Sequence, residues 1–204
     1  MTMKKFLLIL SLLLCVQQMP AQEVTPVDDN PYTFKGIPIE GNVNQFIAKL
    51  EKQGYTVMDM DSPNTAFANK ILLGKFFAQD VAILLAIDSN KNVTSVSVNF
   101  HADKNYTPTD DRINTYNSVR NGLITKYSDT GMWTIDDSRD TKDKSLNDIT
   151  YELVVKGIQY NLNIYKKGVE YPYIMLSLSK DVSILMYTNP KSFESLANSI
   201  FNDL

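Results

Sequence analysis

The stretch from Asn42 to Gly54 decides the fold, and it reads NVNQFIAKLEKQG. Asn42 followed three places later by Gln45 is typical of a helix N-terminus, where such side chains satisfy unpaired backbone N–H groups. The apolar residues of the stretch recur at i, i+3, i+4 and i+7, and they are Val43, Phe46, Ile47 and Leu50. This spacing predicts a short helix with one buried stripe. Gly54 supplies the left-handed residue that ends it.

The residues after Gly54 change their apolar period from about 3.6 to 2, which is the period of strands. The runs 55–58, 71–77, 81–87 and 93–101 follow one another, with polar segments between them. In 81–87 both alternating sets of side chains are apolar, so this strand is expected to be central and covered on both sides. The predicted unit is therefore one helix packed against an antiparallel meander.

A second, diverged copy of this unit is predicted further along. Thr107 and Pro108 begin another helix, whose buried stripe consists of Ile113, Tyr116, Val119, Leu123 and Tyr127. Gly54 and Gly131 lie 131 − 54 = 77 residues apart and open the similar sequences GYTVMD and GMWTID. Strands are predicted at 149–155, 158–165, 173–178 and 182–187. A last helix follows Asn189 and Pro190, and its apolar residues are Phe193, Leu196, Ala197, Ile200 and Phe201.

The fold class predicted from these patterns is α+β, with two tandem helix-plus-antiparallel-sheet units and a C-terminal helix. The units span residues 31–103 and 104–204, and the C-terminal helix belongs to the second. Residues 1–21 and 22–30 precede them as a signal peptide and a flexible leader.

Four segments of the first unit carry a resemblance. They read FKGIPIEG from Phe34, FIAKLEKQGY from Phe46, LGKF from Leu73 and VAI from Val81. The pattern resembles a group of uncharacterised small secreted proteins of Bacteroides-type bacteria. The resemblance implies an envelope or secreted protein, and it brings no active site to transfer. The tandem units are also similar to the β-lactamase-inhibitor-protein-like architecture, which is an analogy of fold and assigns no function.

The N-terminus predicts export. Lys4 and Lys5 precede an apolar run that is too short to span a bilayer, and Ala21 offers a cleavage site. The protein is therefore expected to be periplasmic or secreted. Cys15 is the only cysteine, and Leu14 stands before it where a lipoprotein signal needs a small residue, which argues against lipidation.

Charge and composition narrow the partner classes. Without Lys4 and Lys5 the chain has 20 − 2 = 18 basic residues against 23 acidic ones, a net charge of −5. With no basic cluster beyond Lys166 and Lys167, nucleic-acid binding is not expected. No later stretch is long and apolar enough to span a membrane. No cofactor is expected either, because the chain has no Rossmann or Walker glycine pattern.

The candidates for catalysis are isolated. His101 is the sole histidine, and no nucleophile pattern surrounds it. Asp59 and Asp61 share a strand face, but glycosidases usually use larger scaffolds with aromatic subsites. A calcium loop beginning at Asp137 would place Arg139 at a ligand position and Lys142 where glycine is needed. The acidic stretch 136–148 is therefore interpreted as a solvated hairpin loop.

Tyrosines on the later strands supply the predicted binding surface. The candidate residues are Tyr165, Tyr173, Met175, Leu185 and Tyr187, which would form an exposed aromatic and aliphatic patch on an open sheet face. The alternative is that this face packs against the other unit or the last helix, which would also explain the apolar Leu84 and Val154.

Three functions follow as hypotheses. The first is an exported, non-enzymatic binding or interaction protein with a protein partner. The second is a small hydrolase that uses carboxylates, which requires acidic groups with raised pKa values in a cleft. The third is a carrier of an apolar small ligand, which requires a pocket of several hundred Å³.

Overall fold

The structure is a computed structural model, and it describes residues 32–60, 67–100, 108–128, 131–137 and 141–192. The described residues belong to one compact unit that begins at Tyr32. Its helices are α2 (Val43–Glu51), α3 (Thr109–Tyr127) and α4 (Leu146–Val154). Its strands are β1 (Thr33–Phe34), β2 (Ile37–Pro38), β3 (Thr56–Asp59), β4 (Phe67–Phe76), β5 (Gln79–Ile87), β6 (Val93–Phe100), β7 (Trp133–Asp136), β8 (Tyr160–Lys166), β9 (Ile174–Leu178) and β10 (Ser183–Thr188).

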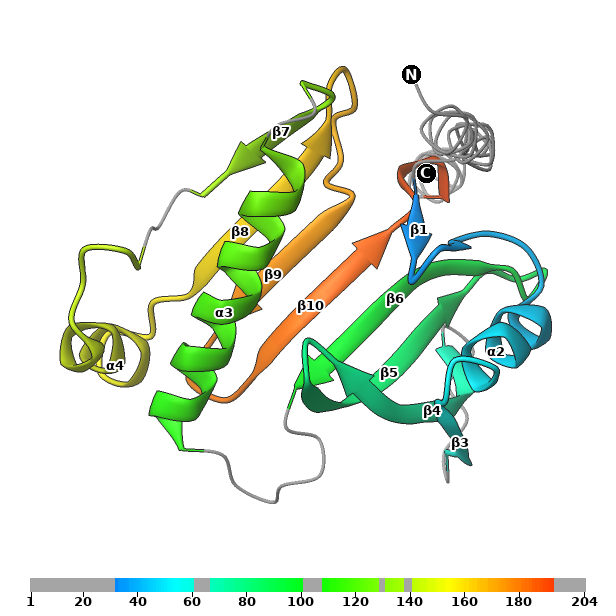
Figure 1. The fold of residues 1–204 in the computed structure, drawn as a ribbon, viewed down its shortest axis with the longest axis horizontal. Helices are drawn as coiled ribbons and strands as arrows, with labels where there is room; N and C mark the ends of the chain where they lie inside the picture. The colour runs from blue at the N-terminus through cyan, green and yellow to red at the C-terminus, as the bar shows by residue number, and fades with distance from the viewer. Residues whose placement is uncertain (1–31, 61–66, 101–107, 129–130, 138–140, 193–204) are drawn as a thin grey trace, which may run out of the picture. The chain divides into compact units, whose positions relative to one another are not determined.

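Eight of these strands form a single sheet in the order β3-β4-β5-β6-β10-β9-β8-β7, and every neighbouring pair is antiparallel (Figure 1). The predicted fold of two helix-plus-sheet units is therefore wrong. The sheet is continuous because β6 pairs with β10 over five residues, Ser95 to Asn99 against Ile184 to Thr188. This long-range pairing leaves no local pattern in the sequence, so the spacing of apolar side chains does not indicate it.

The helix α2 confirms the prediction from the opening stretch. The Asn42 side chain accepts a hydrogen bond from the Asn44 N–H at 3.0 Å, which satisfies one of the free donors at the helix N-terminus. The four residues of the predicted stripe are its buried residues, and Gly54 has a φ of +90°. In contrast, the predicted strand at 149–155 is wrong, because these residues lie in α4 and its continuation.

The sequence did contain a signal for α4. Ser145 accepts a hydrogen bond from the Asp148 N–H at 3.2 Å, and its hydroxyl donates to the Asp148 carboxylate at 2.6 Å. Ile149 and Leu153, the buried residues of α4, are four places apart, which suits one face of a helix. The strand β7 takes the outermost place in the sheet, next to β8.

The sheet has one covered face, which we call the inner face. Its residues include Leu72, Ile83, Val98, Leu185, Leu176, Leu162 and Ile164, all fully buried. The helix α3 packs on β7, β9 and β10 on this side, and Figure 1 shows it in front of this half of the sheet. The predicted stripe of α3 is confirmed, since all five of its residues are buried.

Alternate residues of the same strands point to the opposite side, which we call the outer face. No described helix or strand packs on it. The prediction that strand 81–87 is covered on both sides is therefore not met within the described residues. Leu84 and Ala86 on the outer face are only half-buried, whereas Ile83 and Leu85 are buried.

The small hairpin of β1 and β2 is fastened to the inner side by two polar contacts. The Tyr173 hydroxyl donates to the Thr33 carbonyl and accepts from the Thr33 N–H. The Asn189 side-chain amide donates to the Ile39 carbonyl at 2.9 Å. These contacts join residues about 140 to 150 positions apart, so the N-terminal hairpin closes over the second half of the sheet.

The predicted signal peptide, the flexible leader and the last helix beyond Ser192 fall outside the described residues, as do His101, Asp61 and Arg139. None of the described helices is both long and apolar enough to cross a bilayer.

Candidate functional site

The structure separates the five residues of the predicted binding patch. Tyr165 and Met175 lie on the outer face and are half-buried. Tyr173, Leu185 and Tyr187 lie on the inner side, with 1%, 0% and 6% of their surface exposed. The prediction that all five share an exposed patch is therefore wrong. Leu185 and Tyr187 alternate with Ile184, Met186 and Thr188, which are the residues of β10 that face outward.

Tyr173 and Tyr187 belong to an aromatic cluster that fills the inner face. Their ring centroids are 5.8 Å apart, and Trp133 stacks on Tyr173 at 5.3 Å. Phe34 contacts Tyr187 at 5.2 Å. Burial raises the pKa of both tyrosines, so both hydroxyls stay protonated. These aromatic contacts hold β1 against the sheet, and Phe34, Tyr173 and Tyr187 are too deeply buried to contact a partner.

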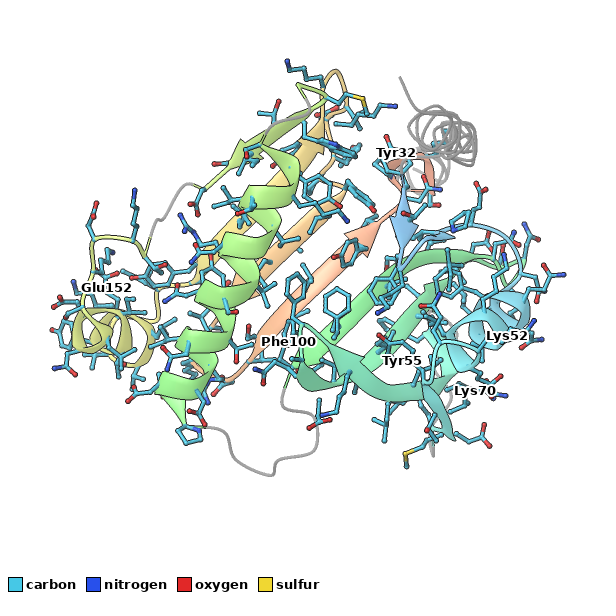
Figure 2. All side chains as sticks on the ribbon, in the orientation of Figure 1. Tyr32, Lys52, Tyr55, Lys70, Phe100 and Glu152 are labelled. Carbon is cyan, nitrogen blue, oxygen red and sulfur yellow. The ribbon has the colours of Figure 1, made fainter. Side chains whose placement is uncertain are left out.

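Three titratable groups that the sequence analysis missed meet where α4 approaches β8. Lys144 donates to the Glu152 carboxylate at 2.6 Å and to the Tyr160 hydroxyl at 3.2 Å. The Tyr160 hydroxyl also donates to Glu152. Figure 2 labels Glu152 at this position. Nothing in the spacing 144, 152 and 160 indicates the cluster, because a loop, a helix and a strand each supply one member.

The pKa shifts of this cluster argue against acid–base chemistry. Hydrogen bonds from Lys144 and Tyr160 lower the pKa of Glu152, and the bond to Glu152 raises the pKa of Lys144. Burial, followed by the bond to Glu152, raises the pKa of Tyr160. Each group is held in the protonation state it already has at neutral pH, whereas a general acid or base needs a pKa near the working pH. The cluster is a clamp between α4 and the sheet.

Two further polar contacts attach α3 to the segment that follows β7. Arg120 forms an ion pair with Asp137, and Thr141 donates to the Asn117 side chain at 2.6 Å. These contacts and α4 replace the solvated hairpin loop predicted for 136–148. No group of three or more histidine, cysteine or acidic residues among the described positions is arranged to hold a metal ion. Asp59 is exposed at the end of β3.

A depression of about 600 Å³ lies at the β3 edge of the sheet. Its lining residues are Gln53, Gly54, Tyr55, Thr56, Leu73, Gly74, Lys75, Asp80 and Val81. Most of these are exposed, and Lys75 forms an ion pair with Asp80 at 3.1 Å on its wall. An apolar ligand would keep much of its surface in water here, so the depression suits a carrier poorly.

Exposed apolar side chains gather instead on the outer face, over β3, β4 and β5. We call this surface the outer patch, and it consists of Met58, Phe67, Ile71, Leu73 and Leu84. Met58, Phe67 and Leu73 are 51%, 36% and 37% exposed. The strand register aligns Met58 with Ile71 and Ile71 with Leu84, so these three form one row across the three strands.

The sequence carried a signal for this surface. Leu84 alternates with buried residues in a strand that is apolar on both faces, and that pattern was interpreted as cover on both sides. The alternative prediction was that this sheet face packs against the other unit, which would bury Leu84 and Val154. Within the described residues Val154 is exposed and Leu84 is only half-buried, so the structure does not show this packing.

No family model, curated protein or solved structure matches this chain. The site therefore has to be interpreted from its own geometry.

Proposed function

We propose that this chain is an exported, non-enzymatic binding protein that meets a protein partner through the outer patch. The observation that carries the proposal is the row from Met58 through Ile71 to Leu84, with Leu73 and Phe67 beside it. A contiguous apolar surface of this kind is typical of interaction sites. The proposed location, periplasmic or secreted, rests on the signal-peptide pattern of residues 1–21.

The chemistry of the patch defines the partner. The five residues of the patch are apolar, the exposed ion pair of Lys75 and Asp80 borders them, and alanines at 82 and 86 lie beside the bulkier residue of β5. An apolar surface with small residues between large ones suits an apolar helix face or an apolar strand face of another protein. Nucleic acid is a poor fit, because phosphate contacts need a basic surface.

The hydrolase hypothesis has less support. Among the described carboxylates, the one with a resolved pKa shift is Glu152, and its pKa is lowered. A hydrolase that works through a protonated carboxylate needs the opposite direction of shift.

The experiment places a photo-crosslinking amino acid at Leu73 in the native host. The expected result is one discrete adduct, and the second change Met58→Ser should weaken it by roughly fivefold, as expected for loss of one well-buried contact. The matched control places the crosslinker at Tyr151 on α4, which is 53% exposed and outside the patch. No adduct at Leu73, or equal adducts at Leu73 and Tyr151, would overturn the proposal.

A further inference from the structure

Methionine is distributed unevenly between the two faces of the sheet. The methionines among the described residues are Met58, Met60, Met132, Met175 and Met186. None of these belongs to the buried core, which is built from leucine, isoleucine, valine, alanine and aromatic side chains. Met58, Met175 and Met186 lie on the outer face. Methionine therefore gathers on the face that no described element covers.

The strand register places these three methionines in one line across the outer face. We call this line the methionine row. Each of its residues pairs with the next on the neighbouring strand, and from β3 to β9 the order is Met58, Ile71, Leu84, Ser97, Met186 and Met175. Side chains that are directly opposite on neighbouring strands are close enough to contact. The β3 end of the row is part of the outer patch, so a partner on the patch covers Met58.

The thioether of methionine has a reactivity that the other apolar groups of the row lack. Its sulfur attacks one oxygen of hydrogen peroxide and the O–O bond breaks. The proton on the attacked oxygen passes to the departing hydroxide, so the products are a methionine sulfoxide and one water molecule. The sulfur loses two electrons and the peroxide gains them. An apolar side chain becomes a polar one.

Exposure decides which methionines react first. Met58 is 51% exposed and Met132 is 50% exposed, whereas Met175 and Met186 are half-buried. Met132 directly precedes β7, which is at the opposite edge of the sheet from β3. The two exposed methionines are therefore equally open to peroxide, but only Met58 lies in the outer patch.

We propose that Met58 is an oxidation site through which hydrogen peroxide weakens the docking of a partner on the outer patch. The proposal rests on the proposed function, because it concerns the same patch. A sulfoxide that is pressed against an apolar partner loses its hydrogen bonds to water, and the burial of an unpaired polar group costs free energy. Methionine sulfoxide reductases reverse the change. Because no described methionine lies in the core, oxidation changes the surface and leaves the fold in place.

The experiment uses the full chain with the photo-crosslinking amino acid at Leu73. The protein is oxidised with hydrogen peroxide, freed of the oxidant, mixed with an extract of the native host and irradiated. Peptide mass spectrometry measures the sulfoxide at each methionine. We expect Met58 and Met132 to be oxidised at rates within about twofold of each other. The Leu73 adduct should fall by roughly fivefold, as for Met58→Ser, and treatment with the reductases should restore it.

Two variants of equal chemistry form the matched comparison. Met58→Leu removes the sulfur and keeps an apolar side chain of similar volume, so its adduct should withstand peroxide. Met132→Leu should lose the adduct on oxidation as the unsubstituted chain does. The melting temperature of the oxidised protein should stay within about 3 °C of the untreated value, because the core has not changed.

The outcomes separate this proposal from the proposed function. An adduct that withstands full oxidation of Met58 overturns the oxidation site and leaves the partner proposal intact. The same holds if Met58→Leu loses its adduct on oxidation, if Met58 stays reduced while Met132 is oxidised, or if the oxidised protein unfolds. No adduct from the untreated chain overturns the proposed function, and the oxidation site with it.

Discussion

The two faces of the sheet are built from alternating residues of the same strands, yet they differ in almost every property. On β9, Leu176 on the inner face is fully buried, while its neighbour Met175 on the outer face is half-buried. On β5, Ile83 and Leu84 show the same contrast. The inner face is packed by three helices, a hairpin and an aromatic cluster, whereas no described element packs on the outer face.

The contrast shows that an apolar sheet face is not always one on which other elements of the chain pack. The β3–β5 half of the outer face carries the five apolar residues of the outer patch, with the ion pair of Lys75 and Asp80 at its border, whereas the β7–β9 half carries Asn161, Asn163 and Ser177. An apolar surface without cover costs free energy in water, at about 25 cal/mol for each Å² that could be buried. That cost is the physical reason to look for an occupant on one half of the face only.

The largest expected effect compares adjacent residues of β9. Leu176→Ala should lower the free energy of unfolding by about 2–5 kcal/mol, because it leaves a cavity in the inner core. Met175→Ala should lower it by less than about 1 kcal/mol, because its side chain is partly exposed. Urea unfolding followed by the fluorescence of Trp133, the only tryptophan, measures both. Similar losses for the two variants would break the distinction between the faces.

A smaller effect concerns the edge of the inner face, where the ring of Tyr55 lies against Gly74. A Cβ at Gly74 would overlap the Tyr55 ring, which is fixed by a hydrogen bond from its hydroxyl to the Lys75 carbonyl at 3.1 Å. Gly74→Ala should therefore destabilise the protein by about 1–3 kcal/mol. In a Tyr55→Leu background the same change should cost less, since the ring is gone. Additive losses in the double-mutant cycle would show that the ring does not set the limit.

The smallest effect is a dependence of stability on pH from the clamp of Lys144, Glu152 and Tyr160. The pKa of Glu152 is lowered in the folded protein, so its contribution is present above the unfolded pKa of about 4.3 and is lost as pH falls through the folded value. The pKa values of Lys144 and Tyr160 are raised, so their contributions are lost as pH rises through the folded values, above about pH 10.

Thermal melts between pH 3 and 11 test this window. Glu152→Gln should reduce the fall of the melting temperature at acid pH relative to the wild-type protein. The control Glu40→Gln, at an exposed position, should leave the dependence of the melting temperature on pH unchanged. If both variants keep the wild-type profile, the clamp does not contribute to the acid dependence.

Part of the candidate site was accessible from the sequence. The double apolar alternation around Leu84 marked an outward-facing apolar set, and the Asn-Pro pair at 189 and 190 marked the helical turn at 190–192. The membership of the patch was not accessible, because Met58, Ile71 and Leu84 become neighbours only through the registers of β3, β4 and β5. Leu185 and Tyr187 were misplaced because strand parity gives two faces and does not say which one is covered. Tyr173 was misplaced because β9 begins only at Ile174, so the alternation along β9 does not fix the side on which Tyr173 lies.

Local interactions determined what the sequence by itself could predict. Helix α2, the apolar stripe of α3 and the positions of β8, β9 and β10 all follow from side-chain spacing within a few turns or residues. Tertiary contacts decided the rest. The pairing of β6 with β10 merges the strands into one sheet, and the hydroxyl of Tyr173 on Thr33 brings the N-terminal hairpin over its inner face. These contacts join residues 80 or more positions apart, and which of many such pairings is most stable depends on the packing of the whole core.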